Sequence, residues 1–188
     1  MEHVTIMSLW LPILLSAVFV FIVSSVVHMF LTYHNKDFKP FPNETAAADA
    51  LRNLNLPEGD YLYPIAGGSA DMRKPEFQEK MLKGPLVRLN IAKGGPMTLG
   101  PLLGQWFIYS LVVGVFAAYI SGRALGIGAP YLQVFRFAGC TAFACYVIAG
   151  WQESIWWRRP WSVTLRNTID GLIYALVTAG TFGWLWPR

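Results

Sequence analysis

Hydrophobic residues gather in four long runs along the chain, separated by stretches rich in polar residues. The runs cover residues 6–31, 102–121, 131–151 and 163–186. A helix rises about 1.5 Å per residue, so about 20 apolar residues cross the roughly 30 Å hydrocarbon core of a bilayer. The pattern therefore predicts a bundle of four transmembrane helices, and the fold class we expect is an all-α membrane protein.

We expect the first run, in residues 1–31, to be a membrane anchor rather than a secretory signal peptide. No Lys or Arg precedes it, its apolar stretch is longer than that of a signal peptide, and no small-residue cleavage site follows it. The other three runs place transmembrane helices 2–4 in residues 102–188.

Between helices 1 and 2, residues 32–101 predict a small α/β module on the cytoplasmic side. Asn43 or Thr45 is placed to cap a helix. The stretches DYLYPIAGG and PLVRLNIAKGG predict two strands, since apolar and polar residues alternate in the second. KPEFQEKMLKG, between them, predicts a short helix with Pro75 in its first turn and Gly84 at its end. The module is too small for a large core, so we expect it to pack against the bundle or a partner.

The apolar runs carry small residues four positions apart, which lets helix backbones approach closely. We therefore expect helices 2–4 to pack tightly, helices 2 and 4 to meet through their small faces, and helix 1 to be more peripheral. A pore lined by small residues would give the same pattern. The third run contributes Ala138 and Ala142. The residues of the other two stripes are Ser110, Gly114, Ala118 and Gly122, and Gly171, Ala175, Ala179 and Gly183.

Composition agrees with a membrane protein. Of the 188 residues, 54% are hydrophobic and only 14% are charged, against about 25% charged residues in soluble domains. Nine of the fifteen Lys and Arg residues lie in residues 36–93 together with eight acidic residues. This segment therefore lacks the unbalanced basic surface that nucleic-acid binding requires. We expect the lipid bilayer, and no nucleic acid, as a partner.

The distribution of Lys and Arg predicts the orientation. In a four-span topology, residues 32–101 and 152–162 share one side, and both termini and residues 122–130 share the other. The first side carries Lys36, Lys39, Lys83, Arg88, Lys93, Arg158 and Arg159 near the membrane, whereas the second carries Arg123 and Arg188. Cytoplasmic loops are enriched in Lys and Arg, so we expect both termini outside the inner membrane.

The stretch GWQESIWWRRPW joins the third and fourth runs. Trp rings prefer the headgroup layer and Arg binds anionic phosphates, so we interpret the stretch as a membrane-anchored hairpin, with a substrate platform as the alternative. Pro160 ends the preceding structure, and Ser162 is placed to cap the next helix. Trp184 and Trp186 form the matching anchor on the outer face. The interfacial anchors of the hairpin are Trp151, Trp156, Trp157, Arg158, Arg159 and Trp161.

Polar residues at the ends of the runs are candidate functional residues, because burying them in a bilayer is costly. Near the cytoplasmic edge lie His28, Gln105, Glu153 and Asp170. If the bundle brings them together, imidazole and carboxylate groups would form a proton or metal site. In the alternative, each is satisfied separately: Asp170 by Arg166, Glu153 by Arg158, and His28 by lipid headgroups.

Two further polar residues belong to this set of candidates. Arg136 lies five residues inside the third run, and it either extends its side chain to the outer surface or bonds to Thr178 or Thr181. His34, just past the first run, is expected at the membrane interface.

No spacing in the sequence predicts a catalytic site. Cys140 and Cys145 are the only cysteines, and five residues apart on one helix they face different directions. Among the histidines, only His28 could bind haem within the bundle. AKGGPMTLG lacks the Gly-Lys-Ser/Thr ending of a phosphate-binding loop. We therefore assign no catalytic residue, no metal and no cofactor from the sequence.

Six stretches, spread over most of the chain, carry a resemblance. They are LWLPILLSAVFVFIVSSVVHM, PEGDYLYP, KGP, GPMTLG, VFRFAG and DGLIYALVTAGTFGWLWPR. Together they resemble a group of small bacterial multi-pass membrane proteins of unassigned function. The resemblance implies a bacterial inner-membrane protein and carries over no catalytic or binding residue.

Three classes of function agree with these features. The favoured class is a non-enzymatic membrane accessory or structural subunit, which packs as a homo-oligomer or within a larger membrane complex. Its support is the small-residue stripes, the compact module and the lack of catalytic spacing. The second class is a small transporter or channel for an ion or small solute, supported by Arg136 and the polar residues at the cytoplasmic edge. The third is an enzyme acting on lipid or quinone.

Overall fold

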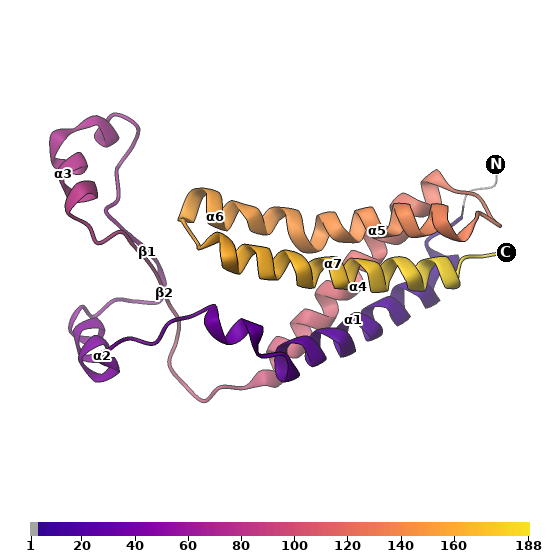
Figure 1. The fold of residues 1–188 in the computed structure, drawn as a ribbon, viewed down its shortest axis with the longest axis horizontal. Coiled ribbons are helices and arrows are strands. Elements are labelled where there is room, and N and C mark those ends of the chain that lie inside the picture. The colour runs from indigo at the N-terminus through magenta and orange to yellow at the C-terminus, as the bar shows by residue number, and fades with distance from the viewer. Residues whose placement is uncertain (1–3) are drawn as a thin grey trace. The chain divides into compact units, whose positions relative to one another are not determined.

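The computed structural model describes residues 4–188 and divides the chain into two compact units (Figure 1). One unit is a helix bundle that runs to Phe38 and resumes over Thr98–Arg188. The other unit is the module Lys39–Met97. Residues 32–38, which we assigned to the module from the sequence, group with the helices instead.

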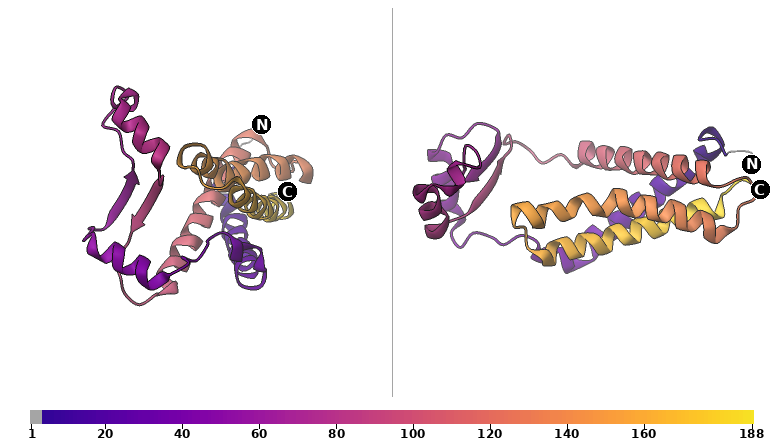
Figure 2. Two further views of the ribbon diagram at one scale, coloured as in Figure 1. Left: turned by 60° about the vertical axis from the view of Figure 1, so that its left-hand side comes forward. Right: turned by 90° about the horizontal axis from the view of Figure 1, so that it is seen from above.

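The bundle contains four long helical segments that run beside one another (Figures 1 and 2). Three of them are long and apolar enough to cross a membrane: Met7–Phe30, Leu99–Ala124 and Tyr131–Trp157. The fourth is not among these three, because Arg166, Asn167 and Asp170 lower the hydropathy of its first half. The elements are η1 (Met7–Leu9), α1 (Trp10–Phe30), α4 (Leu99–Ala124), α5 (Tyr131–Val147), η4 (Ile148–Gly150), α6 (Trp151–Trp157) and α7 (Trp161–Trp184).

Proline residues mark where two of these helices begin. Pro130 directly precedes α5 and Pro160 directly precedes α7, both with extended backbone. Proline has no backbone N–H to donate within a helix, so it is tolerated at this boundary and not in the interior. Ser162, expected from the sequence to cap α7, lies inside its first turn, and no side-chain hydrogen bond caps this helix.

The helices pack in a ring in which α5 contacts α7 most extensively and also contacts α4, while α1 contacts both α4 and α7. The expectation that helices 2 and 4 of the sequence meet through their small faces is wrong, because each stripe faces another helix. The stripe of α4 faces α1, since a Cβ built on Gly114 would lie 3.3 Å from Ile13. The stripe of α7 faces α5, since a Cβ on Gly139 would lie 3.0 Å from that of Ala179. The first helix is therefore an integral member of the ring.

One end of the bundle has a core built from both ends of the described chain. Val4 and Leu9 belong to the same buried cluster as Phe182 and Trp186. The indole Nε1 of Trp186 donates a hydrogen bond of 3.0 Å to the carbonyl oxygen of Gly126. Trp186 is only 5% exposed, so its expected role as an anchor at the outer membrane surface is wrong. Trp184 is exposed, as an anchor requires.

The module has the predicted order of helix, strand, helix and strand. Its elements are α2 (Glu44–Asn53), β1 (Gly59–Tyr63), η3 (Asp71–Arg73), α3 (Pro75–Lys83) and β2 (Val87–Ile91). Asn43 caps α2, accepting a 2.9 Å hydrogen bond from the backbone of Ala46. β1 and β2 pair antiparallel, with Gly59 opposite Ile91 and Tyr63 opposite Val87.

The module lacks a buried core of its own. Val87, Leu89 and Ile91 are half-buried and alternate with exposed residues, as the sequence pattern predicts. Among Lys39–Met97, all of which the structure describes, only Pro64 is buried. Several large apolar side chains are fully exposed, the most exposed being Ile65, Leu82 and Met97.

Candidate functional site

The residues of the candidate site lie just after α1 and in the first half of α7. Helix α1 ends at Phe30, and Leu31 has extended backbone. The chain then forms the short 3₁₀ helix η2 (Thr32–Lys36), closed by a backbone hydrogen bond of 2.9 Å from Asp37 to His34. A 3₁₀ helix eclipses residues three apart, so the side chains of His34 and Asp37 lie on the same side.

Residues of η2, together with Asp37, are joined to α7 by close polar contacts. Nε of Arg166 donates to Oδ1 of Asp37 at 2.6 Å, and Nε2 of His34 lies 2.8 Å from Oδ2 of Asp170. The hydroxyl of Tyr33 donates to Oδ1 of Asp170. Arg166 and Asp170 are four residues apart on α7 and so share one face of that helix. We call these five residues the η2–α7 cluster.

The cluster is largely shielded from solvent, which strengthens its electrostatic interactions. The side chains of Asp37 and Asp170 are 8% and 6% exposed, and those of His34 and Arg166 are 14% and 21% exposed. Burial by itself raises the pKa of Asp37, but the hydrogen bonds from His34 and Arg166 outweigh it and hold that pKa below its usual value. Burial and the hydrogen bond to Asp170 raise the pKa of Tyr33.

His28, on the last turns of α1, lies against the cluster. Its ring stacks on the ring of His34, with centroids 4.7 Å apart and planes 9° from parallel. Nδ1 of His28 lies 3.0 Å from the carbonyl oxygen of Ser24, and Nδ1 of His34 lies 2.7 Å from Oδ2 of Asp37. One ligand atom each of His28, His34 and Asp170 lie within 4.8 Å of one another.

Two of the polar residues singled out from the sequence, His28 and Asp170, therefore meet. Gln105 and Arg136 are exposed, and Glu153 is half-buried on α6. The hydroxyls of Thr178 and Thr181 donate to backbone carbonyls of their own helix.

The structure corrects the expected partners of this site. We expected Asp170 to pair with Arg166 on its own helix, but Arg166 pairs with Asp37 and Asp170 with Tyr33 and His34. His34, assigned from the sequence to the lipid interface, is part of the cluster. The signal for this contact in the sequence is the spacing of His34 and Asp37, three residues apart. This spacing brings the two side chains together only if a 3₁₀ turn follows α1.

The hairpin between the third and fourth long segments is separate from this cluster. It consists of α6 followed by Arg158 in the left-handed region, with φ of 56°. The side chain of Trp151 donates a 3.0 Å hydrogen bond to Oγ1 of Thr168. The exposed indoles are those of Trp151, Trp156, Trp157 and Trp161, and this exposure agrees with a role at a membrane surface.

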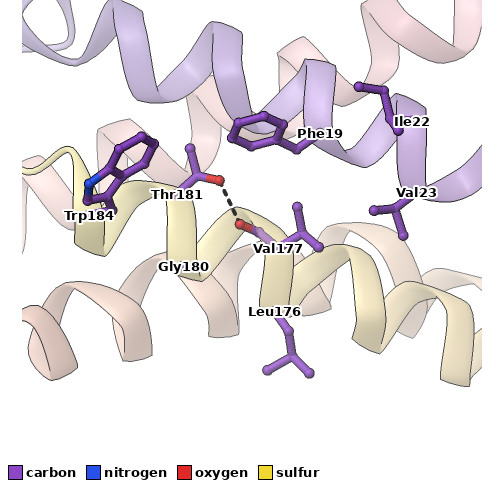
Figure 3. Close-up of a pocket in the computed structure, with 8 residues that line it drawn as sticks. All are labelled: Phe19, Ile22, Val23, Leu176, Val177, Gly180, Thr181 and Trp184. Carbon is purple, nitrogen blue, oxygen red and sulfur yellow. Dashed lines mark hydrogen bonds between the residues drawn. The ribbon is translucent and has the colours of Figure 1, made fainter.

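A groove of about 420 Å³ runs between α1 and α7 (Figure 3). Phe19, Ile22 and Val23 line it from α1, opposite residues of α7 that include Leu176. The hydroxyl of Thr181 is bonded to the carbonyl of Val177 at 2.8 Å. The groove therefore suits an apolar chain, such as a lipid acyl chain, and offers little to a polar substrate.

Comparisons with protein family models, with curated proteins and with solved structures find no match. The chemistry of this site therefore has to be argued from its own residues.

Proposed function

We propose that this protein is an integral membrane accessory subunit whose module, Lys39–Met97, binds a protein partner, either a second copy or a larger membrane complex. The observation that carries the proposal is the lack of a buried core in the module. A unit of this size buries little apolar surface even when well packed. With Pro64 alone buried, the module gains most of its stability only when another surface covers it.

The exposed apolar residues of the module support a protein partner. Ile65 is 73% exposed and Leu82 is 88% exposed, although neither belongs to the apolar helices that face lipid. Their surroundings are charged but balanced in sign, so electrostatic attraction to anionic lipid or nucleic acid is weak. Apolar side chains with a mixed-charge rim are typical of protein interfaces.

In this proposal, the η2–α7 cluster holds the segment that follows α1 against α7. Asp37 is bonded to Arg166 of α7, and the module begins two residues later at Lys39. The cluster therefore fixes the point at which the chain leaves the bundle.

The proposal includes four membrane spans. Val4 and Trp186 share one buried cluster, so both ends of the described chain lie at the same end of the bundle. A chain that starts and ends on one side crosses the membrane an even number of times. Helix α7 has 24 residues, which rise about 36 Å and exceed the roughly 30 Å hydrocarbon core. Its polar residues Arg166 and Asp170 lie in its first half, where Asp37 binds Arg166 and Tyr33 binds Asp170.

Both termini lie outside the inner membrane in this proposal, and cysteine labelling tests the orientation. The parent is a variant without Cys140 and Cys145, carrying Asp60→Cys in the module. A membrane-impermeant maleimide should label it only after the cells are permeabilised. Ile127→Cys, in the connection between α4 and α5, is the matched control and should be labelled in intact cells. Labelling of position 60 in intact cells would contradict the orientation.

Purification in mild detergent tests the accessory role. The full-length protein should elute with a stoichiometric partner or as a defined oligomer. Leu82→Ser should weaken that association, because it removes an exposed apolar side chain of α3, whereas Glu76→Gln on the same helix should not. A monodisperse monomer without a partner, obtained at several detergent concentrations, would contradict the proposal.

A second candidate function is transport of a proton or small ion, favoured by the buried polar side chains along α7. Asp170, Tyr174 and Thr178 are each at most 4% exposed. The hydroxyl of Tyr174 is buried without a hydrogen-bond partner among the described residues. Reconstituted liposomes with an internal pH dye would show proton entry that Asp170→Asn removes and Thr168→Ala preserves. Equal leak in protein-free liposomes would exclude this candidate.

A further inference from the structure

Ligand atoms from three side chains converge at the η2–α7 cluster. One each from His28, His34 and Asp170 lie within 4.8 Å of one another. We propose that these residues bind a divalent transition-metal ion of the zinc class, through Nε2 of each histidine and the carboxylate of Asp170. This proposal is independent of the partner bound by the module.

The hydrogen bonds of the two histidines prepare their Nε2 atoms for a metal. Nδ1 of His28 lies 3.0 Å from the carbonyl oxygen of Ser24, which only accepts, so Nδ1 carries the proton. Nδ1 of His34 lies 2.7 Å from a carboxylate oxygen of Asp37. In a neutral ring with Nδ1 protonated, Nε2 carries the lone pair. Metal-bound histidines have this arrangement, donating their other N–H to a carbonyl or carboxylate.

Nε2 of His34 is a buried nitrogen whose hydrogen-bonding capacity is not used. It lies 2.8 Å from Oδ2 of Asp170, but the direction of this contact is not that of a hydrogen bond, and Nε2 has no hydrogen-bond partner among the described residues. Buried polar atoms are almost always satisfied, so an exception calls for an explanation such as an ion. A cation bound by both this nitrogen and the carboxylate would satisfy them, once the two atoms separate from 2.8 Å to about 3.3 Å.

The remaining groups supply the outer shell and the charge balance. Arg166 is bonded to Asp37, so their charges offset one another. Tyr33 holds Oδ1 of Asp170 and leaves Oδ2 facing His34. A divalent cation bound there would balance the charge of the Asp170 carboxylate.

The ligand set selects the class of metal. Two imidazole nitrogens and one carboxylate suit Zn²⁺, Co²⁺ or Ni²⁺, whereas Ca²⁺ and Mg²⁺ prefer oxygen ligands. Three protein ligands leave a fourth position open, as in zinc sites that also bind water or another molecule.

Binding requires a small movement of His28. Bonds of about 2.0–2.1 Å place tetrahedral ligands roughly 3.3 Å apart, whereas the three ligand atoms here lie within 4.8 Å of one another. The rings of His28 and His34 are nearly parallel, and two stacked rings cannot both aim a nitrogen lone pair at one ion. His28 is exposed, so its ring has room to turn out of the stack toward Asp170, at the loss of the contact between its Nδ1 and Ser24.

The test uses the full-length protein in mild detergent, purified without a histidine tag and treated with a chelator. Titration with Co²⁺, followed by its visible absorption and by competition with Zn²⁺, should show one ion per chain. His28→Ala and Asp170→Asn should abolish that stoichiometric binding. Asp37→Asn, which changes only the outer shell, should weaken it about 10–100-fold. Asp49→Asn, a carboxylate of the module, is the control and should bind as the parent does.

Two results would overturn the site. One is the absence of stoichiometric Co²⁺ binding by the parent protein. The other is binding by His28→Ala and Asp170→Asn that equals binding by Asp49→Asn. His28→Ala keeps the test decisive, because an exposed ring can be removed without unfolding the bundle; its thermal stability without metal should match that of the parent.

Discussion

The close packing of α5 against α7 predicts opposite effects for two Gly→Ala substitutions on α7. A Cβ on Gly171 would lie 2.4 Å from Cγ2 of Val147 and 3.3 Å from Cβ of Tyr146. A Cβ on Gly180 would have its nearest contact at 3.7 Å, with the hydroxyl of Tyr131. Non-bonded carbon atoms are stable at about 3.5–4.0 Å, so Gly180 has room for a methyl group and Gly171 does not.

Two opposing contributions determine how much each substitution changes the free energy of unfolding. Replacing a helical glycine by alanine stabilises the helix by roughly 0.5–1 kcal/mol at both positions. At Gly171 the added methyl group also overpacks the contact, which costs about 1–3 kcal/mol. Val147 is 3% exposed and β-branched, so its side chain cannot simply rotate away. Both variants gain the same helix stabilisation. The difference between their free energies of unfolding therefore gives the steric cost alone, about 1–3 kcal/mol.

Unfolding of the purified protein in mild detergent measures this difference. Tryptophan fluorescence against temperature should give Gly171→Ala a lower Tm than the parent and Gly180→Ala an equal or higher one. For a chain of this size, about 2–4 °C per kcal/mol is expected. If both variants had the same Tm, or if Gly171→Ala were the more stable, α5 and α7 would not approach as closely as we infer.

Three further perturbations have defined outcomes. Ala179→Leu should destabilise the bundle by about 1–3 kcal/mol or more, because Ala179 is fully buried against Gly139; unchanged unfolding in detergent would mean that this face meets lipid. Because the folded pKa of Asp37 is lowered, its stabilisation is present above its unfolded pKa of about 3.9 and is lost as the pH falls through the lower folded pKa. The parent should therefore lose stability on acidification more steeply than Asp37→Asn, and parallel curves would refute this. Trp186→Phe should cost about 1 kcal/mol through the unsatisfied carbonyl of Gly126, measured against Trp184→Phe, which should be neutral.

The long elements could be predicted from sequence because their signals are local. Apolar runs of sufficient length predict helices, and the alternation in residues 87–91 predicts a strand, which the structure has at Val87–Ile91. Glycines of both stripes lie where another part of the bundle comes close. They do not identify the neighbour, since Gly114 and Gly171 would suit any closely packed helix; here the first meets α1 and the second α5.

The η2–α7 cluster could be predicted only in part. His28 and Asp170 stand out as polar residues in apolar runs, so the pattern of hydrophobic and polar positions is enough to identify them. His34 and Asp37 follow the first apolar run, where the sequence alone predicts solvated residues. Only a chain that turns back at η2 brings them to α7. Their pairing with Arg166 and Asp170 also depends on α1 lying beside α7, which is a property of the whole ring.

The contact between Asp37 and Arg166 joins residues 129 positions apart in the chain. During synthesis from the amino terminus, Asp37 is made early, and it lacks its contact with Arg166 until α7 has been made. Until then, of the contacts of Asp37 described above, only the local one with His34 can form. The cluster is therefore completed only after α7 has been made, so a chain truncated before α7 would leave Asp37 and His34 without their partners on that helix.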